Sequence, residues 1–164
     1  MRHAVFMDRD GTIIVEKGYA HKPEDLELIP GSAESIRRLN ELGFLVIVVT
    51  NQAGVARGYY GEEQVRLFHE NMDRVLGGYG ARIDAYYFCP HHAEYGEMVA
   101  CGCRKPAPGM ILQAVADFNV DIAGSYMIGD KTVDMQAAIA AGVFPVMVAT
   151  GYGREQKEQA PHGI

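Results

Sequence analysis

The sequence predicts an α/β fold: a three-layer sandwich with a central parallel sheet of about five strands and helices on both faces. Two observations support this prediction. Short apolar runs alternate with longer amphipathic segments along the chain, which is the pattern of parallel strands joined by helical crossovers. The 164 residues contain no internal repeat and no low-complexity linker, so we expect one domain with a core of its own.

The strands are predicted from five apolar runs that Gly, Pro or polar residues bound on both sides. These runs are residues 4–7, 44–50, 85–89, 125–128 and 144–148. Each is short and apolar on consecutive residues, as expected of strands that helices cover on both faces. The five runs therefore account for the whole predicted sheet.

Four amphipathic segments are predicted to be helices. Ser32 opens the first, and Gly43 closes it in the position of a left-handed cap. The second follows Gly61, and the third starts at Pro108, a residue suited to a first helical turn. The fourth lies between the last two strands and ends at Gly142. No gap between elements is long enough for a large cap domain, so we expect an open active site.

Residues 1–151 are predicted to form the single folded domain. The residues after Gly151 are polar and contain glycine, so we expect residues 152–164 to be a short, mobile C-terminal tail.

Charge and composition exclude several classes of protein. The chain has 21 acidic and 15 basic residues, a net charge of −6, and 48% hydrophobic residues. An acidic chain without basic runs argues against nucleic acid or an anionic membrane as the main partner. No apolar stretch is long enough to span a bilayer, and the apolar run before Asp8 is too short for a secretory signal. We expect a cytoplasmic monomer.

Polar residues fall where the predicted strands end. Asp8 and Asp10 follow the first strand, Thr50 ends the second, and Asp130 follows the fourth. The carboxyl ends of parallel strands form one rim, where ligands bind. Crowded carboxylates repel each other unless a cation lies between them, and hard oxygen ligands suit Mg²⁺. The rim therefore predicts a magnesium site.

Simpler interpretations of these residues exist. Asp8 to Thr12 by itself is equally consistent with a turn that leaves a strand, since Asp and Gly are common turn residues. A calcium-binding EF-hand loop is excluded because Ile13 and Tyr19 stand where Gly and Glu are required. A phosphate-binding P-loop is excluded because Asp130 stands where its lysine should follow.

A second metal site is predicted around the three cysteines. Cys89 is followed closely by His91 and His92, Cys101 lies nine positions after His92, and Cys103 lies two positions after Cys101. Three thiolates and one imidazole complete a tetrahedral set that suits Zn²⁺, and a closed set of four predicts a structural site that fixes a long loop. These residues alone do not decide which histidine binds. The alternative is a core cysteine with two solvated histidines.

Taken together, the motifs resemble the haloacid dehalogenase superfamily of phosphatases. That family has Asp-x-Asp-Gly-Thr after strand one, Thr or Ser ending strand two, a later Lys, and Gly-Asp-x-x-x-Asp after strand four. The corresponding residues here are Asp8 to Thr12, Thr50, Lys105 and Gly129 to Asp134. The resemblance covers most of the chain and implies a metal-dependent phosphatase.

The resemblance implies a role for each of these residues. Asp8 is the nucleophile that forms an aspartyl phosphate, and Asp10 is the general acid and base. Mg²⁺ is held by the Asp8 carboxylate, the Asp10 carbonyl and Asp130. Thr50 and Lys105 hold the phosphoryl oxygens, and Asp134 positions Lys131 or waters on the metal.

Within the superfamily, the zinc loop and the stretch from Thr50 to Gly58 look like the bacterial D-glycero-D-manno-heptose-1,7-bisphosphate 7-phosphatase family. That family pattern favours His91 as the zinc ligand. It implies removal of the 7-phosphate of a small phosphorylated sugar, a step towards lipopolysaccharide precursors. The residues expected to contact substrate are Glu16, Lys17, Gly18, Tyr19, Asn51, Gln52, Ala53, Arg57, Arg104 and Lys131.

Two other functions fit parts of the sequence. The related histidinol-phosphate phosphatases share the Asp-Arg-Asp-Gly-Thr opening and the Cys-x-Cys-Arg-Lys-Pro loop. A zinc-stabilised module that only binds phosphate is a further alternative, although both catalytic aspartates are present. Ile14 and Ala53 depart from the Asn and Ser usual in the heptose family, and the sequence ends before that family's usual final strand and helix. The first two departures bear on the substrate, and the third predicts a loosened sheet edge or a partner that covers it.

Overall fold

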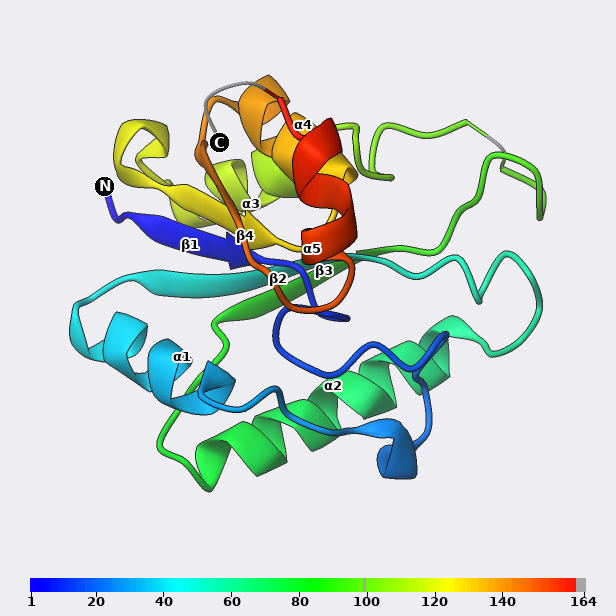
Figure 1. Ribbon diagram of the computed structural model, residues 1–164, viewed down its shortest axis with the longest axis horizontal. Helices are drawn as coiled ribbons and strands as arrows, with labels where there is room; N and C mark the ends of the chain where they lie inside the picture. The colour runs from blue at the N-terminus through cyan, green and yellow to red at the C-terminus, as the bar shows by residue number, and fades with distance from the viewer. Residues whose placement is uncertain (99, 162–164) are drawn as a thin grey trace.

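The computed structural model describes residues 1–98 and 100–161 (Figure 1). Five parallel strands form one sheet in the order β3-β2-β1-β4-β5. The two strands that carry the predicted aspartates, β1 and β4, are therefore neighbours, and β2 lies on the other side of β1. The predicted parallel α/β sheet is confirmed.

The strands lie within one residue of the predicted runs. Residues 4–7 and 85–89 are strands as predicted, the second and fourth strands each begin and end one residue later, and the fifth ends one residue earlier. The observed strands are β1 (Ala4–Met7), β2 (Leu45–Asn51), β3 (Ala85–Cys89), β4 (Tyr126–Gly129) and β5 (Phe144–Met147). Glycine closes β4 immediately before Asp130.

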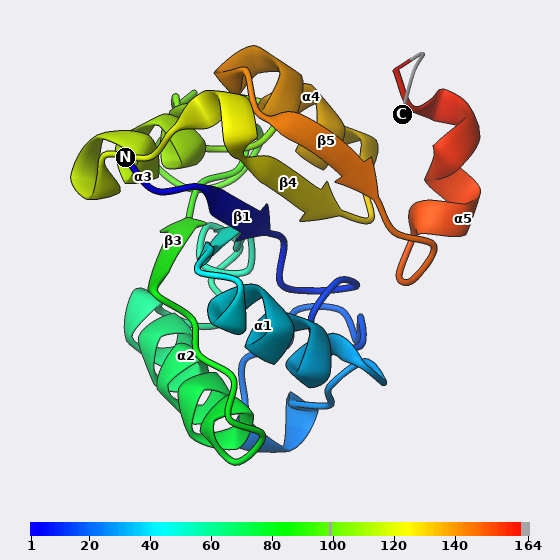
Figure 2. The same ribbon diagram turned by 90° about the vertical axis from the view of Figure 1, so that its left-hand side faces the viewer.

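Helices cover both faces of the sheet (Figure 2), so that α1 and α2 lie on one side and α3 and α4 on the other. Alternate residues of the strands point to opposite layers. Ala4 and Phe6 of β1 pack in the core beneath α3 and α4. Val5 and Met7 pack with the residues of α1 and α2. Both faces are buried, which explains why the strand sequences are continuously apolar.

The helices begin and end close to the predicted positions. They are α1 (Ser32–Glu41), α2 (Glu62–Gly77), α3 (Gly109–Phe118), α4 (Thr132–Ala141) and α5 (Gly153–Gln156). Gly142 ends α4 in the left-handed conformation, as predicted. Pro108 caps α3 from outside rather than starting it. Short 3-10 turns lie at Pro23–Asp25, Ile122–Gly124 and Lys157–Gln159.

The segment after Gly151, which we expected to be a mobile tail, contains α5 and a 3-10 turn. Two hydrogen bonds tie it to the domain: Tyr152 N–H donates to Asp130 Oδ2 at 2.9 Å, and Thr132 N–H donates to Gln156 Oε1 at 2.7 Å. This segment therefore packs beside a predicted metal ligand. No helix within the described ranges is long and apolar enough to cross a membrane.

Candidate active site

A cavity of about 320 Å³ opens at the carboxyl ends of β1, β2 and β4. Most side chains that the sequence assigned to the site line it: Asp8, Asp10, Glu16, Gly18, Tyr19, Asn51, Gln52, Ala53, Arg104, Lys105 and Lys131. The wall also contains Arg9, Tyr60, Val133, Asp134 and Tyr152. Thr50 and Asp130 are buried behind this wall. The topology thus brings together residues from five separate parts of the chain.

Three buried carboxylates form an acidic cluster, and two of them, Asp8 and Asp134, line the cavity. Asp8, Asp130 and Asp134 each place one carboxylate oxygen within 4.8 Å of the other two. Burial, together with the neighbouring negative charges of Asp8 and Asp134, raises the pKa of Asp130 to about 7. Among the described residues, the buried Oδ1 of Asp130 has no hydrogen-bond partner. A hard cation would satisfy that oxygen and relieve the repulsion, so the residues fit Mg²⁺.

Two glycines allow the backbone to approach Asp130. Gly11 and Gly151 both have positive φ, at +82° and +53°. A Cβ atom on Gly11 would lie 2.2 Å from Asp130 Oδ2, and one on Gly151 would lie 2.1 Å from the same atom. Any larger residue at either position would displace this carboxylate. The glycine of the Asp-x-Asp-Gly motif is therefore required by close packing as well as by the turn.

The acidic cluster contains one cation, the ammonium group of Lys105. Its Nζ donates to Asp8 Oδ1 at 2.9 Å and to the Val49 carbonyl at 2.8 Å, and it lies 2.7 Å from Asp134 Oδ1. Burial opposes the charge on this amine, but the carboxylates of Asp134 and Asp8 outweigh it and raise the pKa of Lys105. Lys105 is not a solvated surface residue, since only 3% of it is exposed.

The backbone of Lys105 is held by Asn51. The Asn51 side chain donates from Nδ2 to the Lys105 carbonyl at 3.1 Å and accepts from the Lys105 N–H at 3.0 Å. Next to it, Arg104 Nη1 donates to the His91 carbonyl at 3.1 Å. Asn51 was predicted to contact substrate, and it lines the cavity, but its amide also fixes the loop that carries Lys105.

Asp10 lies beside the acidic cluster rather than in it. Its Oδ2 accepts hydrogen bonds from Arg9 Nε at 2.9 Å and from Gln52 Nε2 at 3.2 Å. Gln52 Nε2 also donates to the Thr50 hydroxyl at 2.9 Å, and Gln52 Oε1 accepts from the Tyr60 hydroxyl at 2.8 Å. The predicted acid and the predicted phosphate-binding threonine are therefore joined through one glutamine side chain.

The outer wall of the cavity is polar and aromatic. Lys131 Nζ lies 3.6 Å from Glu16 Oε2 and 5.0 Å from the ring centroid of Tyr152. Its pKa is raised: burial opposes the charge, but the carboxylates of Asp8, Asp130 and Glu16 favour it. Positive charge is therefore available at the rim for an anionic substrate.

Two predicted substrate contacts do not line this cavity. Lys17 forms an ion pair with Glu27 at 2.8 Å. Arg57 lies over the rings of Tyr95 and Tyr19, at 4.2 and 5.8 Å from their centroids. Because Tyr19 is in the cavity wall, Arg57 supports that wall from behind. Direct contact of either residue with substrate stays a prediction.

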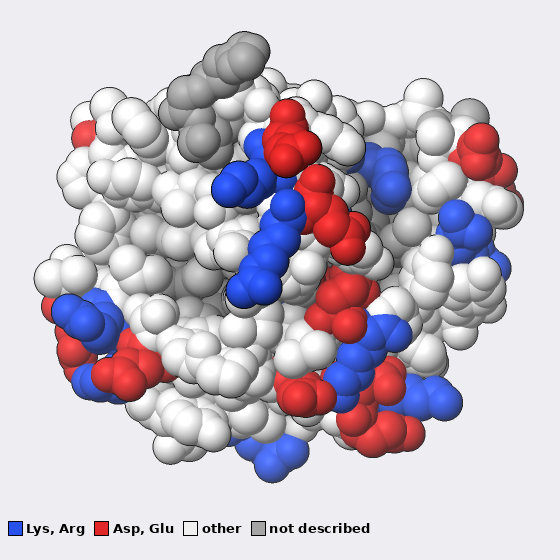
Figure 3. All heavy atoms as spheres, in the orientation of Figure 1, with Lys and Arg blue, Asp and Glu red and all other residues white. Residues whose placement is uncertain are grey.

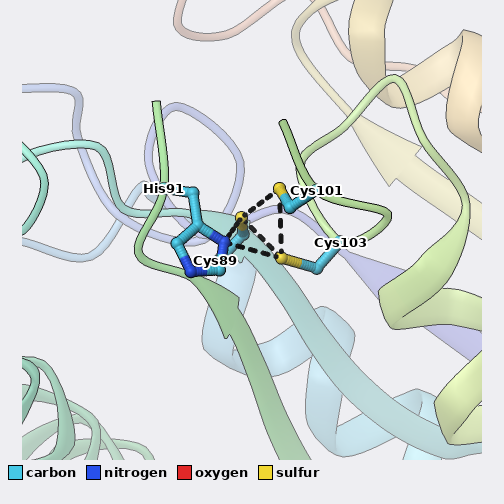
Figure 4. Close-up of side chains that lie close together, drawn as sticks. All are labelled: Cys89, His91, Cys101 and Cys103. Atoms are coloured by element: carbon cyan, nitrogen blue, oxygen red, sulfur yellow. Dashed lines mark hydrogen bonds between the residues drawn. The ribbon is translucent and has the colours of Figure 1, made fainter. Parts of the chain in front are cut away.

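The second metal site is formed by Cys89, His91, Cys101 and Cys103, which we call the thiol cluster (Figure 4). His91 Nδ1 lies 3.6 Å from Cys89 Sγ and 3.4 Å from Cys103 Sγ. Cys101 Sγ lies 3.6 Å from Cys89 Sγ and 3.5 Å from Cys103 Sγ. Neighbouring ligands of a tetrahedral Zn²⁺ with bonds of about 2.3 Å are separated by roughly this distance. Cys103 Sγ and Cys89 Sγ lie closer together, at 2.7 Å. The four residues are therefore compatible with zinc.

The structure decides between the two histidines. His91 points into the thiol cluster, whereas His92 Nδ1 accepts a hydrogen bond from the Glu94 N–H at 3.0 Å. The predicted ligand set with His91 therefore matches the geometry.

Sequence analysis did not assign Arg9, Tyr60, Val133 or Tyr152 to the site. Arg9 is 1% exposed, and its place between the two motif aspartates was the one signal that could have singled it out. Tyr60 lies after the predicted strand and turn, and burial raises its pKa to about 12. Tyr152 was placed in the tail. The local sequence gives no reason to bring either tyrosine to the cavity.

The fold and the site together define a phosphatase of the haloacid dehalogenase class. A parallel sheet places an Asp-x-Asp-Gly turn, a buried lysine and a second acidic turn around one cavity. Consistent with this class, a family model described as HAD-hydrolase-like matches residues 102–163.

The chain belongs to the family of D-glycero-beta-D-manno-heptose-1,7-bisphosphate 7-phosphatases. It is similar to the enzyme of that name from Yersinia pestis, with 49% identity over 154 residues that cover 90% of this chain and 81% of the relative. The Escherichia coli K12 enzyme is 46% identical, with coverage of 90% and 80%. A solved D,D-heptose 1,7-bisphosphate phosphatase from B. bronchiseptica, complexed with magnesium and phosphate, superposes with a TM-score of 0.89 at 36% identity. That superposition covers 99% of this chain and 90% of the other.

Proposed function

We propose that this phosphatase removes the 7-phosphate of D-glycero-beta-D-manno-heptose 1,7-bisphosphate. The observation that carries the proposal is the cavity wall, where the Asp8 nucleophile, Lys105 and the Asn51-Gln52 pair lie within one polar pocket. Relatives with 45–49% identity bear the name of this activity, which specifies the β anomer. Ile14, one of the two unusual positions, is fully buried and does not line the cavity, so it gives no reason for a different substrate.

In the first half-reaction, an oxygen of Asp8 forms a bond to phosphorus while the bond between phosphorus and the sugar oxygen breaks. Asp10 donates a proton to the departing sugar oxygen. In the second half-reaction, Asp10 takes a proton from water, the water oxygen attacks the aspartyl phosphate, and Asp8 and inorganic phosphate are released. Lys105, which already contacts Asp8 at 2.9 Å, and Thr50 hold the phosphoryl oxygens.

The catalytic metal in this proposal is Mg²⁺, held by the carboxylates of Asp8 and Asp130 and the carbonyl of Asp10. When bound, it supplies positive charge that offsets the repulsion between an anionic nucleophile and an anionic phosphate. Asp134 is already occupied, since it pairs with Lys105 and accepts from the Lys131 N–H at 3.0 Å. Its part is to hold Lys105 and the turn that carries Asp130.

Recognition of the sugar is assigned to the outer wall. Arg104 and Lys131 provide charge for the phosphate that is kept, and Glu16, Gly18, Tyr19, Gln52 and Ala53 complete the contact surface. A planar guanidinium is suited to a phosphate that must be held without being cleaved. Arg104 is the better candidate because the thiol cluster fixes its loop, whereas Arg57 stacks on tyrosines outside the cavity.

We further propose that residues 1–151 act as one catalytic domain, with Tyr152 added from the following segment, in a cytoplasmic monomer. Reduced cysteine thiols for Zn²⁺ suit a reducing compartment. Acidic and basic side chains are interspersed over the face in Figure 3 rather than gathered by sign. Such a face offers no extended basic surface for nucleic acid.

The experiment that tests the proposal compares kcat/KM for the heptose bisphosphate and for histidinol phosphate in the presence of Mg²⁺. Asp8→Asn serves as the blank because it keeps the shape of the nucleophile and removes its charge. Asp117→Asn is the matched control, since that exposed aspartate bonds Tyr87 on the outer surface of the domain. We expect a preference of at least about a hundredfold for the bisphosphate, close to 3 kcal/mol. A preference for histidinol phosphate, or phosphate release that persists in Asp8→Asn, would contradict the proposal.

A further inference from the structure

Arg9, which lies between the two aspartates of the motif, is the largest of the fully buried side chains in the described structure. A buried guanidinium is costly unless its charge is paired and its N–H groups are bonded. The proposed mechanism assigns no function to Arg9. The hydrogen bonds of its guanidinium indicate one.

The Arg9 guanidinium donates two parallel hydrogen bonds to the carboxylate of Asp10, the proposed general acid. Its Nε donates to Asp10 Oδ2 at 2.9 Å, and its Nη2 donates to Asp10 Oδ1 at 3.2 Å. This fork uses both carboxylate oxygens, so it fixes the plane of the carboxylate as well as its position. A lysine could not reproduce it, because an ammonium group has no planar pair of donors.

The same guanidinium is anchored to three other elements. Nη2 also donates to the Ala20 carbonyl at 2.8 Å and to Gln52 Oε1 at 3.2 Å. Nη1 lies 3.4 Å from His69 Nε2 on α2, and the guanidinium carbon lies 4.6 Å from the centroid of the Phe68 ring. Burial, followed by the positive charge of Arg9, lowers the pKa of His69 to about 3, so a neutral imidazole is available to accept this bond.

These contacts connect the acid to the core of the domain. His69 stacks on Tyr86 at 4.3 Å between ring centroids, and the Tyr86 hydroxyl donates to Asp73 at 2.7 Å. His69 and Phe68 of α2 thus fix the position of the Arg9 guanidinium, and the guanidinium fixes the carboxylate of Asp10. Ala20 belongs to the loop whose residues Glu16, Gly18 and Tyr19 line the cavity.

We propose that Arg9 is a positioning residue that holds the Asp10 carboxylate in the orientation required for proton transfer to the leaving oxygen. This inference rests on the proposed role of Asp10. The reaction step concerned is the departure of the substrate alcohol: as Asp8 bonds to phosphorus, the ester bond breaks, and the departing oxygen takes the proton of Asp10. Arg9 does not touch the reacting atoms and acts through Asp10.

The test uses substrates that differ in their need for the acid. The leaving group of 4-nitrophenyl phosphate is a stable anion and departs without a proton, whereas phenyl phosphate and the heptose ester need one to an increasing degree. In Arg9→Met we expect kcat/KM to fall by less than about fivefold for 4-nitrophenyl phosphate and by at least about a hundredfold for the heptose ester, with phenyl phosphate between them. The aryl pair gives a result whether or not heptose bisphosphate is the physiological substrate.

A double-mutant cycle with Asp10→Asn shows whether Arg9 acts through Asp10. Asp10→Asn alone should give the same dependence on leaving group, and adding Arg9→Met should lower the remaining activity by less than about twofold. Arg37→Met is the matched control, since it removes a half-exposed arginine that pairs with Glu41 on α1, and it should leave all three substrates unaffected.

Because Arg9→Met removes a buried charge, Arg9→Lys provides a milder variant that keeps the charge and most of the volume. In Arg9→Lys, kcat/KM should fall in the same order across the three substrates, but by only about tenfold for the heptose ester. Equal losses on all substrates in either variant, or losses that add to those of Asp10→Asn, would overturn the inference in favour of a purely structural role. An Asp10→Asn variant without any leaving-group dependence would overturn the acid role of Asp10 and, with it, this inference.

Discussion

The acidic cluster and the thiol cluster both bring a set of metal-ligating groups together, but they differ in what holds them. The acidic cluster lies directly after β1 and β4, with Asp134 in the first turn of α4, and contains its own cation, the ammonium group of Lys105. The thiol cluster joins the end of β3 to an irregular loop. The sheet fixes the first cluster, whereas a bound metal would close the second.

The two clusters are nevertheless linked through a short piece of chain. Lys105 lies two residues after Cys103, and Arg104 lies between them. The Arg104 side chain returns to the His91 carbonyl, and the Lys105 side chain reaches Asp8. A metal that closes the thiol cluster therefore fixes the lysine that balances the acidic cluster. A metal bound there would serve catalysis by holding the chain and not by touching the substrate.

Among the substitutions considered, Lys105→Met should disrupt the acidic cluster most. It leaves Asp8 and Asp134 buried without their shared cation, which should cost roughly 3 kcal/mol of unfolding free energy. Activity should fall by at least about a thousandfold, because the phosphoryl oxygens lose a positive charge inside the site. Urea unfolding and steady-state kinetics measure the two effects. Arg66→Met, which removes an exposed arginine paired with Glu62 on α2, is the matched control. Normal activity in Lys105→Met would contradict the assigned role.

Removal of each metal should have a different effect on activity and on thermal stability. Protein purified without chelator should contain about one equivalent of Zn²⁺. Cys103→Ser should lower kcat/KM by between about tenfold and a hundredfold and lower the melting temperature, because the loop before Arg104 and Lys105 loses its clamp. Removing Mg²⁺ from the wild type should abolish activity while leaving the melting temperature nearly unchanged. A zinc-free protein with full activity and unchanged melting would contradict the role of the thiol cluster.

Acid should destabilise the domain through His69, which belongs to neither cluster. Because the pKa of His69 is lowered from about 6.5 in the unfolded chain to about 3 in the fold, the unfolded state binds more protons below pH 6.5. The stability that the neutral imidazole provides is complete above pH 6.5 and is lost as the pH falls towards 3. At pH 5 the loss is about 2 kcal/mol relative to pH 7.

His69→Gln tests this because glutamine keeps an acceptor for Arg9 and does not titrate. Unfolding free energies of both proteins, measured in urea at pH 7 and pH 5 with both metals present, should show a smaller acid loss in the variant. Equal losses in the two proteins would show that acid acts only on the metal clusters.

The smallest effect is expected from the side chain of Tyr152. The N–H of this residue holds Asp130, and that bond survives truncation of the ring. Tyr152→Ala removes only the part of the cavity wall that the ring forms and the contact of the ring with Lys131. That contact contributes about 0.5–1 kcal/mol. We therefore expect a rise in KM of roughly two- to fivefold at unchanged kcat. A large fall in kcat would mean that the ring, and not the backbone, orders the acidic cluster.

Local sequence patterns were sufficient for the elements and for the motif residues. Apolar runs located every strand to within one residue because strands covered on both faces are continuously apolar. Asp8, Asp130 and Lys105 were found because each belongs to a short motif. The spacing of the cysteines located the thiol cluster, the family resemblance favoured His91 as its histidine, and the geometry places His91 and not His92 in it.

Residues without a local pattern were missed. Arg9 looked like a charged turn residue, and its burial follows from contacts with residues 11, 43 and 60 positions away in the sequence. Tyr152 looked like the start of a tail, but its N–H is directed at a carboxylate 22 positions earlier. Arg57 was assigned to the substrate from a motif, while the structure places it against two tyrosine rings.

The sequence by itself determined the sheet, the strand-end carboxylates and the three cysteines of the thiol cluster, because hydrophobic periodicity and ligand chemistry are properties of neighbouring residues. The tertiary structure alone decided that Lys105 is the cation of the acidic cluster, that Arg9 holds Asp10, and that residues after Gly151 complete the site. These are contacts between residues far apart in the chain. They exist because the strand order places β4 beside β1 and because burial forces each charged group to find a partner.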